Sequence, residues 1–361
     1  HPGNKSESYS YDSEGHVLTH ADGNEAANIT AYLYDALGQV LSKTLSDGSV
    51  MSYLYDNWGN RTRVSTPELD TTYTFDYLNR LVQETQTLTD LPGESKTITR
   101  GYALDSQLNS LTDASGKVFQ YAYDNRGLLR TVQYLDQPIA TYAYNAFGKP
   151  ASLTYANNYT TEYAYDNLQR LEDQTIKNAQ AQAVWSHEYS YDAESNRTSL
   201  VEALPSGSEG TDRTVNYTFD TLNQLKTVNY TDVGVGVDIA YTYDKFGNRT
   251  NYVHNGDTTN YAYTPNTNEL ASYTINNTLS VASQYDNNGS LTQEVYTRAS
   301  QPLKTVDYAW NKENRLAGVT YTDNSRPAFL PGVENNTLAF VYDDYGNRIK
   351  KSVNNEASYY I

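Results

Sequence analysis

The ten residues from Tyr241 to Thr250 read Tyr-Thr-Tyr-Asp-Lys-Phe-Gly-Asn-Arg-Thr, and they decide the fold of this chain. Tyr241 and Tyr243 are two residues apart, so they point to the same face of a β-strand. Asp244 suits the first position of a type I turn, where its carboxylate accepts hydrogen bonds from amides ahead of it, and Gly247 supplies a positive φ. The stretch therefore predicts a β-hairpin with a bulged turn. It is not an enzyme motif.

The same pattern recurs along the whole chain, with strong copies from Tyr53 and from Phe340. The second aromatic of the unit, or its substitute, falls at fifteen positions: Tyr11, Tyr34, Tyr55, Phe75, Leu104, Tyr123, Tyr144, Tyr165, Tyr191, Phe219, Tyr243, Tyr263, Tyr285, Trp310 and Tyr342. Their mean spacing of about 24 residues is typical of repeat proteins. The next residue is Asp in twelve copies, and eight copies have Gly three positions later. The sequence thus predicts an all-β fold, a repetitive antiparallel β-hairpin array with two strands per repeat, filling residues 1–361 as one array.

Four copies carry the clearest turn chemistry. Their predicted structural residues are Asp56, Gly59, Asp124, Gly127, Asp244, Gly247, Asp343 and Gly346. We expect each Gly to adopt a positive φ and each Asp to cap the amides of its turn.

A second class of turn is expected between the repeats. Asp22-Gly23, Asp47-Gly48 and Asn255-Gly256 are dipeptides favoured in two-residue hairpin loops. The Ala-rich stretch from Asn178 to Trp185 is compatible with a turn of helix.

Composition limits the classes of function. The formal net charge of −17 opposes nucleic acid or an anionic membrane as a partner. No apolar run approaches 18 residues, so membrane insertion is not expected. The 36 Tyr residues, against 7 Phe, predict a core of stacked Tyr rungs, and the absence of Cys excludes disulfides and thiol chemistry.

Candidate chemical groups point to structure rather than to catalysis. Arg residues recur beside the turn, which favours turn stabilisation and salt bridges because a catalytic residue is needed only once: Arg61, Arg80, Arg170, Arg197, Arg249, Arg315 and Arg348. Each turn supplies one carboxylate, whereas Ca²⁺ takes six to eight oxygens. The titratable residues outside the repeat are His16, His20, His187 and His254. The sequence therefore predicts no catalytic residue, no cofactor and no metal ligand.

The motif Tyr-Asp-x-x-Gly-Asn-Arg, repeated at this spacing, resembles the YD repeat of the Rhs family. The strongest matches start at Tyr55, Tyr243 and Tyr342. That family includes bacterial Rhs proteins, B/C components of insecticidal toxin complexes, wall-associated proteins and teneurins. The resemblance implies a β-strand spiral that curls into a hollow shell, which in bacterial members encloses a toxic C-terminal polypeptide. It also implies a secreted or cell-surface protein.

This chain departs from the bacterial members in one respect. No Asp-Pro-Leu-Gly-type self-cleavage segment is present, so no cleavage residue can be assigned. Both ends break off in register with the repeat, so we expect a segment of a longer protein. Its open strand edges should pair with flanking repeats or with another copy, and an isolated segment should self-associate.

Two classes of function remain, with a third less favoured. The first is a wall segment of an extracellular shell that encloses or presents a toxic or effector polypeptide. The alternative is a cell-surface carbohydrate-binding or adhesion module that uses Tyr-rich strand faces, with a glycan as partner. A polysaccharide-cleaving enzyme would need a cluster of non-repeat polar residues. Tyr pairs buried as rungs would favour the first class, and Tyr pairs open in a groove would favour the second.

Overall fold

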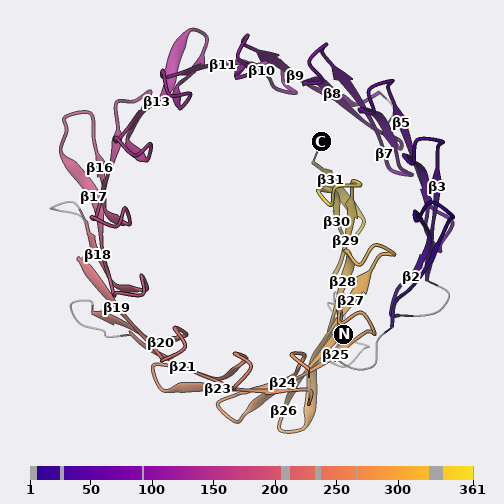
Figure 1. Ribbon diagram of the computed structural model, residues 1–361. Coiled ribbons are helices and arrows are strands. Elements are labelled where there is room, and N and C mark those ends of the chain that lie inside the picture. The colour runs from indigo at the N-terminus through magenta and orange to yellow at the C-terminus, as the bar shows by residue number, and fades with distance from the viewer. Residues whose placement is uncertain are drawn as a thin grey trace. The chain divides into compact units, whose positions relative to one another are not determined.

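The computed structural model describes residues 6–24, 28–91, 93–204, 212–231, 237–265, 267–324 and 336–360. These residues contain no helix, and their 31 strands belong to one antiparallel sheet (Figure 1). The predicted fold class, a repetitive antiparallel hairpin array, is confirmed. The chain divides into two compact units: unit 1 is His1–Ile98 with Asn260–Ile361, and unit 2 is Thr99–Thr259.

Unit 1 contains strands from both ends of the chain. The first group is β1 (Ser8–Tyr11), β2 (Val17–Ala21), β3 (Ile29–Tyr34), β4 (Val40–Thr44), β5 (Val50–Tyr55), β6 (Arg61–Ser65), β7 (Leu69–Phe75) and β8 (Leu81–Leu88). The second group is β24 (Leu270–Ile275), β25 (Leu279–Tyr285), β26 (Leu291–Arg298), β27 (Gln301–Trp310), β28 (Leu316–Asp323), β29 (Asn336–Tyr342), β30 (Arg348–Val353) and β31 (Glu356–Tyr359).

Unit 2 contains an uninterrupted series of strands. They are β10 (Leu108–Thr112), β11 (Val118–Tyr123), β12 (Leu129–Tyr134), β13 (Gln137–Tyr144), β14 (Pro150–Tyr155), β15 (Thr160–Tyr165), β16 (Leu171–Lys177), β17 (Ala183–Tyr191), β18 (Arg197–Ala203), β19 (Arg213–Phe219), β20 (Leu225–Thr231), β21 (Val237–Tyr243) and β22 (Arg249–His254). Two further strands, β9 (Ser95–Tyr102) and β23 (Asp257–Tyr263), cross the unit boundaries.

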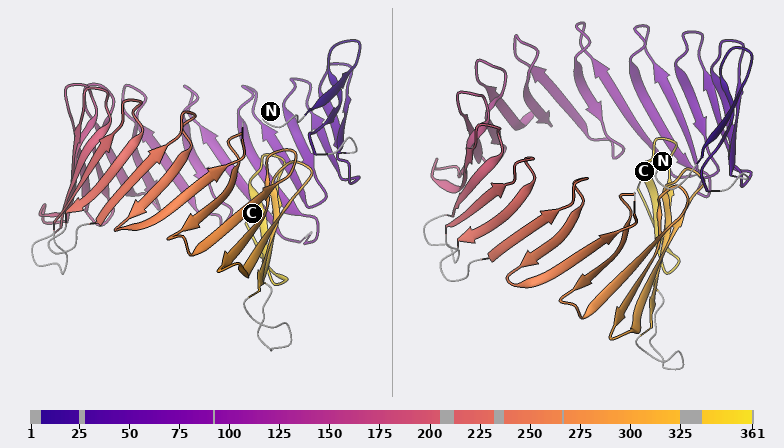
Figure 2. Two further views of the ribbon diagram at one scale, coloured as in Figure 1. Left: turned by 90° about the horizontal axis from the view of Figure 1, so that it is seen from below. Right: turned by 60° about the horizontal axis from the view of Figure 1, so that its bottom comes forward.

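Successive strands pair as hairpins with a bulge at the repeat motif. In β13 and β14, Ala143 lies opposite Ser152, and the register then shifts so that Tyr144 lies opposite Pro150. Because consecutive strands are antiparallel, the turns that follow the aromatic pairs all lie at one edge of the sheet within a unit (Figure 2). We call these the repeat turns. The other connections lie at the opposite edge.

The fully buried core is aliphatic, which corrects the prediction of stacked Tyr rungs. Among the tyrosines of the described residues Tyr53 alone is buried, with 8% of its surface exposed; its buried neighbours are Leu45, Met51 and Val64. Most other tyrosines of the strands lie half-buried, because a single layer of strands covers a flat ring on one side only. Their hydroxyls take a different role, described below.

Two expected two-residue loops are wrong. Asp47-Gly48 belongs to a bulged repeat-type turn in which Leu45 takes the Asp position, since the Gly48 amide donates to the Leu45 carbonyl. Asp22 and Gly23 lie in the longer connection between β2 and β3, and the Asp22 amide donates to the Asn28 carbonyl. Asn255-Gly256 does form a two-residue loop, with φ of 52° and 88°.

Two further expectations need correction. One repeat is shifted by two residues: Tyr102, not Leu104, is its second aromatic, because the Ser106 amide donates to the Ala103 carbonyl and Ser106 has a φ of 68°. The Ala-rich stretch from Asn178 is a turn of the repeat type and not a turn of helix.

Candidate functional site

Each repeat turn is closed by the Asp at its start. In unit 2, Asp124 Oδ1 accepts hydrogen bonds from the amides of Arg126 at 2.9 Å and Leu128 at 3.0 Å. These donors, the Leu128 amide above all, hold the pKa of Asp124 below its usual range. Asp56 and Asp244 accept the amides two and four residues ahead in the same way, and their pKa values are lowered mainly by the side-chain amides of Asn60 and Asn248. The carboxylates serve the backbone and are not presented to a ligand.

The fourth turn residue needs a left-handed backbone. Gly59, Gly127, Gly247 and Gly346 have φ of 85°, 79°, 85° and 91°. The Asp343 carboxylate, which caps the last of these turns, accepts the Asn347 amide at 2.7 Å. Asn79, Gln169 and Ser195 take the same conformation elsewhere. The turn therefore imposes a positive φ on its fourth residue, whether or not that residue is glycine.

In ten repeats the second aromatic residue, a tyrosine in nine of them, links its hairpin to the preceding one by a hydrogen bond. Tyr144 donates to the Leu129 carbonyl at 2.7 Å, and Leu129 is the first residue of the returning strand of the previous hairpin. The same link, from 2.7 to 3.1 Å, joins nine further pairs: Tyr34 to Val17, Tyr55 to Val40, Tyr123 to Leu108, Tyr165 to Pro150, Tyr191 to Leu171, Tyr243 to Leu225, Tyr285 to Leu270, Tyr342 to Leu316, and the Trp310 indole to Leu291. Phe cannot make this bond, which explains why the repeat prefers Tyr.

A second series of links runs along the repeat turns. The side chain four residues after the Asp position reaches the next turn: Gln107 Nε2 donates to the Gly127 carbonyl at 3.3 Å. A Cβ on Gly127 would come within 2.9 Å of that nitrogen. Arg170 reaches the Asp192 carbonyl at 2.9 Å in the same manner. Glycine therefore serves both the positive φ and the close approach of the neighbouring repeat.

The recurring arginines divide into two groups. Those that directly precede the returning strand, such as Arg80 and Arg170, pair with the Asp of their own turn at 2.7 Å. Those that open the returning strand lie over an aromatic ring, as Arg197 lies 4.5 Å from the Tyr189 ring centre. Both arrangements stabilise the hairpin.

In unit 1 the two groups of strands meet along a line of contacts that we call the seam. Asn24 donates to Asp286 at 2.9 Å, and Lys43 pairs with Glu313 at 2.5 Å. Arg61 pairs with Asp344 at 3.2 Å. Burial raises the pKa of Asp344 despite this guanidinium, and burial together with the Asp344 charge raises the pKa of Tyr53 to about 12.

The far end of the seam is apolar, with a charged margin. Leu69, Leu88 and Ile349 form one buried cluster. Beside it, Asp90 accepts hydrogen bonds from Lys350 at 3.0 Å and from Tyr359 at 3.1 Å. Neither the apolar cluster nor its margin follows from the repeat pattern.

One polar cluster lies outside the repeat pattern in unit 2. Glu202 accepts the Trp185 indole N–H at 2.9 Å and the Arg213 guanidinium at 2.6 Å, and His187 Nε2 lies 3.5 Å from it. The indole hydrogen bond, followed by the Arg213 charge, holds the pKa of Glu202 below its usual range. A carboxylate held by three partners on a sheet face is a poor general base.

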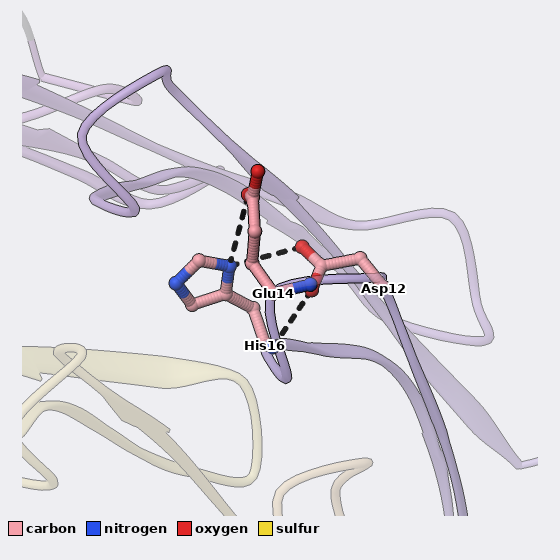
Figure 3. Close-up of side chains that lie close together, drawn as sticks. All are labelled: Asp12, Glu14 and His16. Atoms are coloured by element: carbon pink, nitrogen blue, oxygen red, sulfur yellow. Dashed lines mark hydrogen bonds and ion pairs between the residues drawn. The ribbon is translucent and has the colours of Figure 1, made fainter.

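Two other histidines, His20 and His254, each pack against a tyrosine ring. His20 stacks on Tyr9 with ring centres 4.5 Å apart, and His254 lies over Tyr252. In the described residues, one group of metal-ligating side chains comes together, formed by Asp12, Glu14 and His16 (Figure 3).

The Asp12, Glu14 and His16 group is a repeat turn with Gly15 at its fourth position and a histidine at its fifth. Asp12 Oδ1 accepts the amides of Glu14 and His16, and Oδ2 accepts the His16 Nδ1–H at 2.9 Å. Glu14 is largely exposed and lies 3.9 Å from the ring. The sequence did not predict that Glu14 lies beside Asp12 and His16. The signal for the histidine is its spacing, because a residue four positions after the Asp of a bulged turn lies next to the Asp carboxylate.

The fold and the turn chemistry define a class of protein, the YD-repeat hairpin arrays. Residues 94–346 match the Teneurin YD-shell family, and residues 34–68 match the RHS repeat. This chain belongs to the Teneurin YD-shell family.

The chain is also similar to part of two curated proteins, and its fold resembles part of several solved structures. A tRNA3(Ser)-specific nuclease WapA of Bacillus spizizenii and a tRNA nuclease WapA of Bacillus subtilis are each 29% identical over 147 residues, 37% of this chain. The matched region spans only 5% of those proteins. The Tc holotoxin pore of Photorhabdus luminescens aligns with a TM-score of 0.66 at 18% identity, over 96% of this chain and 20% of that one. A TcdB2-TccC3-Cdc42 structure aligns at 0.55 and 16%, over 96% and 24%.

No helix in the described part of the chain is long and apolar enough to cross a membrane.

Proposed function

We propose that this chain is a wall segment of a secreted or cell-surface shell that encloses or presents a toxic or effector polypeptide. The observation that carries the proposal is the double series of links between hairpins, through tyrosine hydroxyls and through the turns. Hydrogen bonds of this kind fix the position of each hairpin relative to the next, so a sheet of one layer can be stable with a small hydrophobic core. Similarity to a Tc holotoxin pore supports the comparison with a toxin shell.

We also propose that the segment carries out no chemistry. The Asp side chains that open its turns are occupied by turn amides, its repeated Arg side chains by carboxylates or rings, and Glu202 by three partners. The hydroxyls of nine second-position tyrosines of the repeat are likewise bonded to main-chain carbonyls. This arrangement favours the structural role over the polysaccharide-cleaving one.

The experiment uses the full-length product of the gene that encodes this chain. Limited proteolysis followed by mass spectrometry should reveal a polypeptide outside the repeats that survives while the repeats are intact. The same polypeptide should become cleavable when repeat turns are disrupted by Gly59→Val and Gly247→Val. If every non-repeat segment is cut as fast in the intact protein as in the disrupted one, the enclosure proposal fails.

A cleft in unit 1 favours carbohydrate binding as a second candidate. It has a volume of about 430 Å³ and is lined by Asn28, Asn287, Tyr308, Trp310 and Lys312, among others. Amide groups beside aromatic rings suit a neutral sugar. A glycan array that shows a specific ligand, whose binding is lost in Asn287→Ala, would support this role. If no glycan on the array binds, the carbohydrate-binding role is rejected and the wall function remains.

A further inference from the structure

The turn between β1 and β2 brings three metal-ligating side chains to one point (Figure 3). His16 Nδ1 lies 2.9 Å from Asp12 Oδ2 and 3.9 Å from Glu14 Oε2. The ligand atoms of the three residues all lie within 4.8 Å of one another. Ligand atoms of a tetrahedral Zn²⁺ site are about 3.4 Å apart, because each lies about 2.1 Å from the metal. The two distances from Nδ1 lie on either side of that value.

Two of the three side chains are held in place by the surrounding turn. Asp12 Oδ1 accepts the amides of Glu14 and His16 at 2.9 Å each, which leaves Oδ2 directed at the imidazole. The His16 ring stacks on Tyr34 with ring centres 4.9 Å apart, and a Cβ on Gly38 would lie 2.7 Å from its Nε2. Nδ1 therefore faces the carboxylates. The Glu14 side chain is 77% exposed, so it is free to move closer.

A turn of unit 2 has the same arrangement with one ligand missing. Asp192 and Glu194 occupy its first and third positions, and Asn196 stands in the place of His16. The Asn196 main-chain amide binds Asp192 Oδ1 at 2.7 Å, and its side-chain Nδ2 binds Oδ2 at 3.0 Å. An amide nitrogen only donates, whereas an imidazole nitrogen without its proton can bind a metal. Either residue therefore completes the turn, and histidine adds the capacity to bind a metal.

We propose that Asp12, Glu14 and His16 bind one divalent transition-metal ion, such as Zn²⁺, through Oδ2, Oε2 and Nδ1. An imidazole with two carboxylates suits Zn²⁺ better than Ca²⁺ or Mg²⁺, which take oxygen ligands. The ion replaces the hydrogen between Nδ1 and Oδ2, and the imidazole then carries its proton on Nε2. The formal net charge of −17 favours a cation. The inference goes beyond the wall function and does not depend on it.

The bound ion joins the first, third and fifth residues of the turn, so it stabilises the hairpin of β1 and β2. Strand β1 is exposed along its whole length, and its amides should therefore exchange with solvent readily without the ion. Zinc should slow that exchange.

The test titrates the whole chain with ZnCl₂ in an isothermal titration calorimeter. His16→Asn removes the imidazole and introduces the residue that the unit 2 turn uses. Glu14→Gln removes one carboxylate, and Asn196→His builds the same three ligands in unit 2. Circular dichroism and denaturant unfolding without zinc check the folding of each variant. Three other histidines are unchanged throughout, so zinc bound to them is common to all samples: His20, His187 and His254.

We expect His16→Asn to bind one zinc ion fewer than the wild type and Asn196→His to bind one more. Glu14→Gln should bind zinc about tenfold more weakly or worse. Hydrogen exchange of residues 8–21 should slow with zinc in the wild type and not in His16→Asn.

Equal zinc binding by the wild type and His16→Asn would overturn the proposal, and so would an Asn196→His variant that gains no ion. If His16→Asn is less stable than the wild type, Glu14→Gln decides, because its exposed side chain contributes little to the turn. Unchanged zinc affinity in Glu14→Gln would then show that the three residues do not form one site.

Discussion

Units 1 and 2 use the same hairpin but are held together by different interactions. Unit 1 brings two strand groups together and buries Leu69, Leu88 and Ile349 between them. Unit 2 has fully buried apolar side chains at Val215 and Val228, with the rest of its sheet half-exposed. Hairpin-to-hairpin links must therefore carry more of the stability of unit 2, and the repeat motif exists to supply them.

The largest expected effect removes the seam core. Leu69→Ala deletes a side chain that is 2% exposed and leaves a cavity, so we expect unit 1 to lose about 2–5 kcal/mol. Hydrogen exchange measured by mass spectrometry should show faster exchange in residues 6–91 and 267–360, with unit 2 unchanged. Leu222→Ala changes a side chain that is 71% exposed in a repeat turn of unit 2; it is the control and should change the stability of neither unit. Equal acceleration of exchange in both units would contradict the expectation that this core stabilises unit 1 alone.

The second effect strains a repeat turn in unit 2. Gly127→Ala places a Cβ at a φ of 79° and beside Gln107, so we expect a loss of at least about 1 kcal/mol. Gly116→Ala has a φ of 83° with nothing within 4 Å of the new Cβ, and it isolates the cost of the backbone conformation. Denaturant unfolding of both variants measures the difference. Two unchanged curves would show that these glycines are not required.

A smaller effect removes one tyrosine link. Tyr144→Phe deletes the hydroxyl bond to the Leu129 carbonyl and should destabilise unit 2 by about 1 kcal/mol. Tyr142→Phe is the matched control, because among the described residues its hydroxyl makes no bond to a main-chain carbonyl. If both substitutions lower the free energy of unfolding by the same amount, the hydroxyl bond of Tyr144 does not stabilise unit 2.

The smallest effect is a difference in acid sensitivity. Hydrogen bonds lower the folded pKa of Asp124 and Asp166, so their contribution is present above the unfolded value near 3.9 and is lost as pH falls through the folded pKa. Burial raises the pKa of Asp344 in unit 1, so its contribution is present below the unfolded value and is lost as pH rises through the folded pKa. Acid should therefore weaken the repeat turns of both units, because hydrogen bonds also lower the pKa of Asp56 and Asp76 in unit 1. Denaturant unfolding of the wild type should have a lower midpoint at pH 3 than at pH 7, and Asp124→Asn, which cannot titrate, should narrow that difference. An equal difference in the wild type and the variant would contradict this.

The repeat, its two strands and its Asp caps could be predicted because they depend on neighbours within about ten residues. The shifted repeat at Tyr102 was missed because Leu104-Asp105 imitates the motif, while Ala103 can occupy the Asp position without a carboxylate. Asp47-Gly48 was misread because Leu45, like Ala103, occupies the Asp position of its turn without a carboxylate. The seam could not be predicted, because its pairs are some 260 to 280 residues apart and use residue types common on any surface.

The central claim is that links between hairpins, not a core, hold unit 2 together. Its most direct test is the triple variant Tyr123→Phe, Tyr144→Phe and Tyr165→Phe, which removes three consecutive links while keeping every ring. Hydrogen exchange by mass spectrometry should then show lost protection across β10 to β16, with unit 1 at wild-type rates. Unchanged protection of β10 to β16 would contradict the account.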